Sequence, residues 1–315
     1  MKKYIAFLCL LIIFILSACQ ADFEMPVDTY ELQINLNGSL QNPAWSPDGK
    51  QVVFTRFRNG YNQGPADIFI FDFDSQEIIE LVNNQADNVN LPGSTWNSEN
   101  HHIVFSSTIS EHDEIFSIDT HNREAIPIQL TSREYQMAYE PSYSPDGEWI
   151  IFESHELDTE DGGVIMKVKL DGENQYIPLT PSNIDCRQPN WSPDGKHILY
   201  QAYNNQQWNI WIMDADGKNH HQLTSGPGDK TDASFSPDGQ WIVFSADNPE
   251  IKFSELFIQS IFDSQAIQLT DYGIYVGAPS WSPDGNQIIF EASERDPDKT
   301  NGTELWVLDN LPTWK

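Results

Sequence analysis

The sequence contains few cysteines and few basic residues. Cys9 and Cys19 both lie close to the N-terminus, so Cys186 is the only thiol in the rest of the chain. No internal disulfide can form there, and stability has to come from packing. We expect Cys186 to be a small buried hydrophobic residue and not a reactive thiol. Lysine and arginine number 17 against 47 acidic residues, a net charge of −30, which argues against nucleic acid and anionic lipid as direct partners because both would be repelled.

Long apolar runs are also scarce. The N-terminal run from Tyr4 to Leu16 is shorter than the about 20 residues of a spanning helix, and with Lys2 and Lys3 before it the segment is typical of an export signal. The residues that follow, ending at Ala18-Cys19, resemble the bacterial lipobox, in which the cysteine becomes the lipidated first residue. We expect lipidation at Cys19, with cleavage near Ala18 without lipid as the alternative.

These features predict residues 1–19 as a lipoprotein signal and 20–28 as a short tether to the membrane through acyl chains. The expected location is the cell envelope. Gln20 after the cysteine resembles the outer-membrane sorting pattern, which would place the protein on the periplasmic side of that membrane. In a cell with one membrane it would lie at the cell surface.

Enzyme signatures are missing from the sequence. It has no G-x-S-x-G nucleophile elbow and no H-x-H or H-E-x-x-H spacing. Its histidine pairs, 101–102 and 220–221, are neighbours, and neighbours on a strand point to opposite faces. The acidic loop 296–304 resembles a calcium loop in outline, but its glycine comes one place late, so a solvated loop is expected. We expect no catalytic residue, no metal and no cofactor.

One internal repeat runs through the rest of the chain. Six segments align without gaps at 43–56, 94–107, 141–154, 189–202, 233–246 and 279–292, and five of them contain the letters S-P-D-G. Each has an aromatic residue before the turn and an apolar run after it, which predicts a hairpin: short strand, tight turn, buried strand. Aromatic residues form 12% of the chain, so the acidic composition does not indicate disorder.

Two further strands are expected in most repeats. A second apolar strand is predicted in every repeat, at 67–73, 114–119, 164–170, 209–215, 255–261 and 304–310. A fourth is predicted in five, at 77–82, 126–131, 176–180, 220–224 and 266–270, four of them ending in Leu-Thr. Four strands per unit of this length is the blade of a β-propeller.

The sixth repeat lacks its outer strand, and the segment Tyr30–Leu36 alternates like one. We therefore predict an all-β, six-bladed propeller over residues 29–315, closed by the N-terminal strand in blade six. An open solenoid of hairpins is the alternative, but it would need capping units that the sequence does not show.

The W-S-P-D-G-x-x-I-x-F repeat resembles the WD-like repeats of TolB, the periplasmic protein of the Tol–Pal system. Similar repeats occur in the propeller domains of prolyl-oligopeptidase-type peptidases and in oligogalacturonate lyase. The resemblance covers residues 29–310. TolB also has an α/β domain ahead of its propeller, and here only about ten residues separate Cys19 from the first strand, a reach of about 35 Å. We expect the propeller without that domain.

The S-P-D-G aspartates are interpreted as turn residues, so function is expected on the opposite face of the ring. That face should bring together residues just before the inner strands and in the middle-strand loops. The candidate partner-binding residues are Arg56, Arg58, Tyr61, Glu140, Arg187, Asp232 and Tyr275. His155 lies in one of the same loops. Arg56 and Arg187 suit a carboxylate of a peptide or a uronic sugar. For Arg187 the alternative is a salt bridge to Glu140 or Asp232.

The resulting hypothesis is a membrane-anchored module that binds an envelope protein or peptide at the channel face, as the resemblance to TolB implies. A carbohydrate-binding or lyase-like propeller is the first alternative. A scaffold that acts through the sides of its blades is the second.

Overall fold

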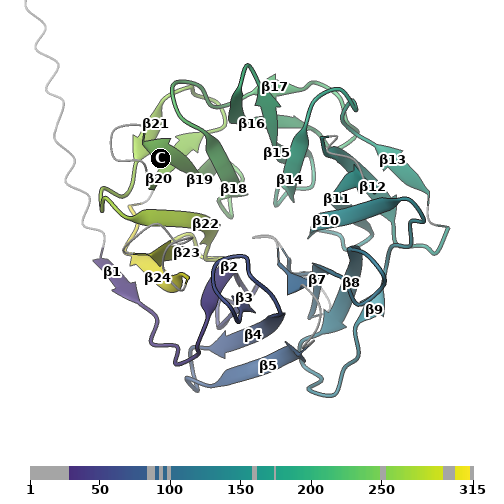
Figure 1. Ribbon diagram of the computed structural model, residues 1–315. Coiled ribbons are helices and arrows are strands. Elements are labelled where there is room, and N and C mark those ends of the chain that lie inside the picture. Colours follow the sequence, from purple (N-terminus) through teal and green to yellow (C-terminus); the bar gives the residue numbers. More distant parts are fainter. Residues whose placement is uncertain are drawn as a thin grey trace, which may run out of the picture.

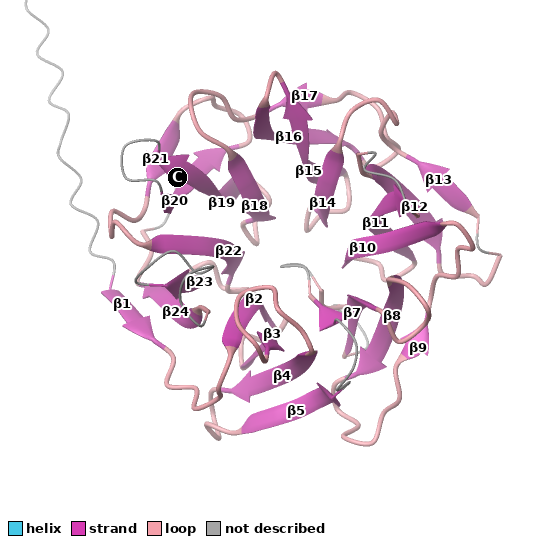
Figure 2. Ribbon diagram, in the orientation of Figure 1, coloured by secondary structure: helices cyan, strands magenta, loops and turns pink. Residues whose placement is uncertain are grey.

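A ring of six β-sheets forms the protein, and every sheet contains four strands. The computed structural model describes residues 28–83, 89–91, 95–97, 101–157, 162–173, 175–248, 253–293 and 302–312. Figure 1 shows the sheets arranged as blades around a central axis, and all regular structure in the described residues is β-strand (Figure 2). The predicted six-bladed propeller is confirmed. Within the described residues, no helix has the length and apolar character needed to cross a membrane.

The strands follow the repeat. The innermost strands are β2 (Ser39–Trp45), β6 (Val89–Asn90), β10 (Gln136–Tyr143), β14 (Cys186–Trp191), β18 (Lys230–Phe235) and β22 (Tyr275–Trp281). The second strands are β3 (Gln51–Phe57), β7 (His102–Ser107), β11 (Trp149–Glu156), β15 (His197–Asn204), β19 (Trp241–Asn248) and β23 (Ile288–Ser293). The third strands are β4 (Ala66–Asp72), β8 (Glu114–Asp119), β12 (Val164–Lys169), β16 (Gln207–Asp214), β20 (Phe253–Ser260) and β24 (Glu304–Asp309).

All the outer strands except that of blade one are shorter than predicted. They are β5 (Ile78–Asn83), β9 (Ile128–Gln129), β13 (Tyr176–Pro178), β17 (His221–Gln222), β21 (Ala266–Gln268) and β1 (Asp28–Glu31). The Leu-Thr pair explains why they end early. In four blades the threonine hydroxyl accepts a hydrogen bond from a third-strand amide, as Thr180 Oγ1 does from Ile165 N at 2.9 Å. A side chain thus continues the ladder where the backbone departs.

Each S-P-D-G turn is closed by the side chains of its serine and aspartate. In the first turn, the Ser46 hydroxyl donates to Asp48 Oδ1 at 2.7 Å, and Lys50 N donates to the same oxygen at 3.1 Å. Gly49 has φ +70°, a conformation that favours glycine. The other four turns repeat the serine–aspartate bond. These hydrogen bonds lower the pKa of Asp48 against the effect of its partial burial, as befits a structural carboxylate.

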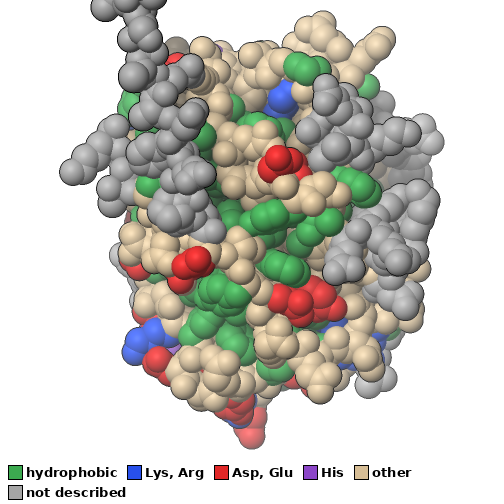
Figure 3. Space-filling view, turned by 90° about the vertical axis from the view of Figure 1, so that its left-hand side faces the viewer, with side chains coloured by type: hydrophobic (Ala, Val, Ile, Leu, Met, Phe, Trp, Pro, Cys, Tyr) green, Lys and Arg blue, Asp and Glu red, His purple; other side chains and the backbone are tan. Residues whose placement is uncertain are grey.

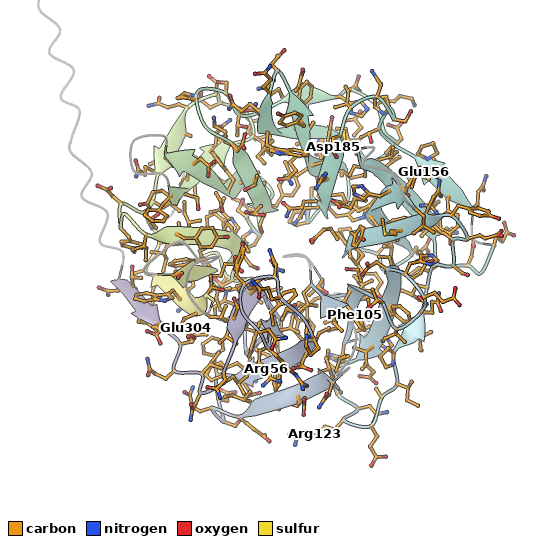
Figure 4. The ribbon with its side chains drawn as sticks, in the orientation of Figure 1. Arg56, Phe105, Arg123, Glu156, Asp185 and Glu304 are labelled. Atoms are coloured by element: carbon orange, nitrogen blue, oxygen red, sulfur yellow. The ribbon has the colours of Figure 1, made fainter. Side chains whose placement is uncertain are left out.

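Neighbouring blades share the hydrophobic core. On β3, Val52 and Phe54 pack with Ile289 and Leu305 of blade six, whereas Val53, between them, packs with blade two. Both faces of the second strand are therefore buried, which explains its continuous apolar run where a half-exposed strand would alternate. The phenylalanine of the repeat is fully or almost fully buried in five blades, including Phe105 (Figure 4).

The ring closes through the N-terminal strand, as predicted. β1 pairs antiparallel with β24, with Asp28 opposite Asp309 and Glu31 opposite Trp306. The paired strand begins two residues earlier than expected and ends at Glu31. Leu32 and Ile34 continue the segment as buried contacts between blades six and one. Blade six is thus built from both ends of the described chain, so the closure joins them non-covalently.

Hydrophobic side chains form a band across the side of the ring near this closure (Figure 3). Tyr30 of β1 and Tyr272, which follows β21, are each about two-fifths exposed. The Tyr272 hydroxyl is within hydrogen-bond distance of Thr29 Oγ1. Blade five therefore also holds the closing strand.

We expect Leu32→Ala to lower the free energy of unfolding by about 3 kcal/mol, because it removes a buried side chain from the closing segment. Urea denaturation followed by tryptophan fluorescence measures the change. Glu31→Ala, on the exposed position next to it, serves as the control. Equal stability of the two variants would show that the closing segment contributes little.

Candidate functional site

The innermost strands bring a repeated backbone distortion to the central channel. The pairing between the first and second strands shifts register in five blades. One residue at each shift has a positive φ between 45° and 57°; these residues are Asn42, Glu140, Gln188, Asp232 and Ala278. All five line one cavity at the channel axis, which we call the channel mouth. The corresponding residue of blade two, Gly93, lies outside the described residues.

At the channel mouth, therefore, the same backbone conformation recurs from blade to blade, whereas the side chains differ. Positive φ is uncommon for residues other than glycine, and such positions cluster at functional sites. Amide, acid and methyl groups alternate around the ring at this position. Two of the predicted site residues, Glu140 and Asp232, lie here. This face is opposite the S-P-D-G turns, because the same strands reach those turns at their other ends.

Arg56 and Arg58 do not project freely. Both guanidinium groups bind Asp67, at 2.5 Å from Arg56 Nη2 and 2.7 Å from Arg58 Nη2, and the Asp67 side chain is fully buried. Arg56 also lies over the ring of Phe69, 4.9 Å from its centroid. The hydrogen bonds to Asp67 raise the pKa of Arg58. The two predicted ligand-binding arginines form an ion-pair cluster with Asp67 in blade one, where Figure 4 labels Arg56.

Tyr61 and Tyr275 meet, as their common place on the predicted face implies. Their hydroxyl oxygens are 2.8 Å apart, and the Tyr275 hydroxyl donates to Glu291 Oε1 at 2.9 Å. Glu291 Oε2 accepts a hydrogen bond from Asn42 N at the channel mouth. Burial raises the pKa of Glu291 to about 7, and it also raises the pKa of both tyrosines.

A second polar cluster lies between blades three and four. Arg187 pairs with Asp185, two residues before it, at 2.8 Å and not with the expected Glu140 or Asp232. Its guanidinium carbon is 5.2 Å from the centroid of the Trp208 ring. His155 Nε2 is 3.0 Å from Glu153 Oε1, and this hydrogen bond raises the pKa of His155.

Glu153 and Glu291 occupy the same position in two blades, and sequence reasoning missed both. In every blade the residue after the phenylalanine or tyrosine of the second strand is polar, although the strand is otherwise apolar. These six residues are all buried: Thr55, Ser106, Glu153, Gln201, Ser245 and Glu291. Each glutamate accepts a bond from the positive-φ residue of the next blade, Gln188 N for Glu153 at 2.9 Å and Asn42 N for Glu291 at 3.1 Å. That periodic polar position was the available signal.

The remaining predictions concern Cys186, metal ligands, Cys19 and the loop 296–304. Cys186 is buried, and burial raises the pKa of its thiol to about 11, so it is the expected inert hydrophobic residue. No group of three or more potential metal ligands occurs among the described residues. Cys19 and most of the loop 296–304 lie outside the described residues.

Fold and site together define a six-bladed propeller with a polar channel mouth on the face away from its tight turns. The chain belongs to the TolB beta propeller domain family, whose model matches residues 26–207 and 182–305. This confirms the resemblance based on the W-S-P-D-G repeat.

Individual relatives include proteins named as TolB, as a lyase and as a peptidase. A putative TolB of Agrobacterium tumefaciens has the same fold with a TM-score of 0.66 and 17% identity, covering 91% of this chain and 98% of its own. An oligogalacturonate lyase of Vibrio parahaemolyticus has a TM-score of 0.57 and 12% identity over 92% and 98% of the two chains. The uncharacterized peptidase YuxL of Bacillus subtilis is 32% identical over 35% of this chain and 18% of its own length. This chain spans 40% or less of the curated relatives that it matches in sequence.

We expect Glu291→Gln to flatten the pH dependence of stability. The raised pKa means that the folded chain binds more protons than the unfolded chain between about pH 4.5 and 7, so native stability falls as the pH rises through this window. The difference in the free energy of unfolding between the native chain and the variant should change by up to about 3 kcal/mol across this pH window. Urea unfolding at pH 4.5, 6 and 8 measures it. The exposed variant Glu173→Gln should follow the native curve; if Glu291→Gln follows it too, Glu291 does not titrate in this range.

Proposed function

We propose that the protein is an envelope-anchored binding module that holds a protein or peptide partner at the channel mouth. The observation that carries this proposal is the convergence of Asn42, Glu140, Gln188, Asp232 and Ala278 on one cavity. A catalytic ring would need particular groups at fixed places, whereas a mouth of varied hydrogen-bonding groups suits recognition of one particular surface. Membership of the TolB propeller family supports the same class of function.

The two clusters beside the mouth support recognition by preorganisation. Glu291 and Glu153 each fix a backbone amide of the mouth, and each is held in turn by a neighbouring side chain, Tyr275 or His155. The mouth side chains are thus presented from a backbone that is already ordered. Ordering before binding reduces the entropy lost on association.

The direction of the closing strand supports an orientation relative to the membrane. Asp28 pairs with Asp309, and Gln287 Nε2, just after the last S-P-D-G turn, donates to Asp309 Oδ1 at 3.1 Å. The chain therefore enters the propeller at the S-P-D-G face. A lipid on Cys19 would keep this face within about 35 Å of the membrane. The channel mouth then points away from the bilayer, toward a partner in the envelope.

Photo-crosslinking in the native cell tests the proposal. A benzophenone amino acid replaces Glu140 at the channel mouth, and the matched control replaces Lys196, an exposed residue on the S-P-D-G face. We expect a discrete protein adduct from position 140 and none from position 196.

Adducts from neither position, or equal adducts from both, would contradict protein binding at the mouth. A probe at Phe262, exposed in the turn between the third and outer strands of blade five, distinguishes the scaffold alternative, because only that role predicts an adduct there and none at the mouth. Binding of an oligosaccharide by the purified chain, without any protein adduct, would favour the carbohydrate alternative.

A further inference from the structure

A second cavity lies on blade three, apart from the channel mouth, and shares no lining residue with it. Its volume is about 570 Å³, within the range of small-molecule sites. We call it the Arg133 cavity; its lining residues include Arg133, Gln136, Glu156, Met166, Pro178 and Ser182. Figure 4 shows Glu156 on the outer part of the ring, away from the axis.

Arg133 differs from the other described arginines. Arg56, Arg58, Arg123 and Arg187 each bind a carboxylate, at distances between 2.5 and 3.1 Å. Arg133 has no carboxylate within ion-pair distance among the described residues, although the chain carries a net charge of −30. A guanidinium without a direct ion pair can still form a charge-assisted, bidentate contact with an anionic ligand.

The Arg133 side chain is held in place without being neutralised. Its guanidinium carbon is 4.9 Å from the centroid of Tyr176 and 5.7 Å from that of Phe152. Nη1 donates to the hydroxyl of Ser154, and the backbone amide donates to Glu114 Oε1. Partial burial lowers the pKa of the guanidinium, although the charges of Tyr176, Glu114 and Glu156 act in the opposite direction. The two rings and the Ser154 hydroxyl hold the guanidinium in place without a direct ion pair.

The remaining walls indicate the rest of the ligand. Met166 and Pro178 give the cavity an apolar side, and methionine adapts to side chains of different shape. Ser182 contributes a hydroxyl, and the Gln136 amide donates to the carboxylate of Glu156, which lines the same cavity. No aromatic side chain lines the cavity among the described residues, and the ring of Tyr176 is already covered by Arg133. Sugar rings commonly stack on free aromatic faces, so the walls fit an apolar side chain better than a uronic acid.

We propose that the Arg133 cavity binds the free C-terminal carboxylate of a short peptide, with Arg133 holding the carboxylate and the terminal apolar side chain lying against Met166 and Pro178. This site is independent of the partner proposed for the channel mouth. The arginine role expected for Arg56 and Arg187, both of which are ion-paired, thus belongs to Arg133.

The experiment titrates the full chain, labelled with ¹³C at its methionine methyl groups, with acetyl-Ala-Ala-Leu and with the C-terminal amide of the same peptide. Methyl NMR follows Met166, and Met213, buried in β16, is the internal reference. We expect a saturable shift of the Met166 signal with the free acid, and affinity for the amide weaker by about tenfold or more.

Variants separate binding from folding. Arg133→Gln should weaken free-acid binding about tenfold or more, whereas Arg123→Gln, an exposed arginine paired with Glu77, should bind as the native chain does. Ser182→Trp should block the cavity while leaving the Arg133 contacts in place, which keeps the test decisive if Arg133→Gln destabilises blade three.

Equal affinity for acid and amide, unchanged binding by Ser182→Trp, or no shift of Met166 at any peptide concentration would overturn the proposal. A Met166 shift with galacturonic acid and none with the peptide would overturn it in favour of an acidic sugar. The crosslinking result at position 140 is unaffected by any of these outcomes, so the two proposals fail separately.

Discussion

The structure depends on the burial of each blade against both of its neighbours. A second strand such as β3 is apolar at successive positions because one set of its side chains packs on blade six and the other on blade two. Neither face of a blade can be left uncovered, so the sheets form a closed ring. The last blade then needs an outer strand, and β1 supplies it by pairing with β24. Closure, core and the position of the N-terminal entry all follow from this packing.

The polar groups of the channel face are built into the same arrangement. Each of the two buried glutamates, Glu153 and Glu291, accepts a hydrogen bond from the next blade, and in both cases the donor is a main-chain amide at the channel mouth. Contacts between blades therefore order the mouth. Stability and recognition are linked because Glu291 binds Tyr275 of its own blade and Asn42 N of blade one at the channel mouth.

Charge distribution explains which cations are available. The chain has 17 basic and 47 acidic residues, so most arginines lie close to a carboxylate. Arg187 pairs with Asp185, two residues away in sequence, and Arg56 pairs with Asp67 on the adjacent strand. Scarcity in composition made Arg56 and Arg187 attractive candidates, but scarcity does not reveal pairing. Arg133, on the loop before β10, is set apart by its stacking on Tyr176 and by the absence of an acid within ion-pair distance among the described residues.

The sequence by itself determined the number of blades, the order of strands, the tight turns and the closing strand, because each is specified by local chemistry repeated along the chain. The serine and aspartate of a repeat, such as Ser46 and Asp48, close its turn, and apolar runs mark the strands. It also placed Tyr61 and Tyr275 on one face. Only the tertiary structure decided which side chains are free. The pairing of Arg56 with Asp67, the burial of Glu291 and the contact of Arg133 with Tyr176 depend on distances between side chains on different strands, which no pattern along one chain encodes.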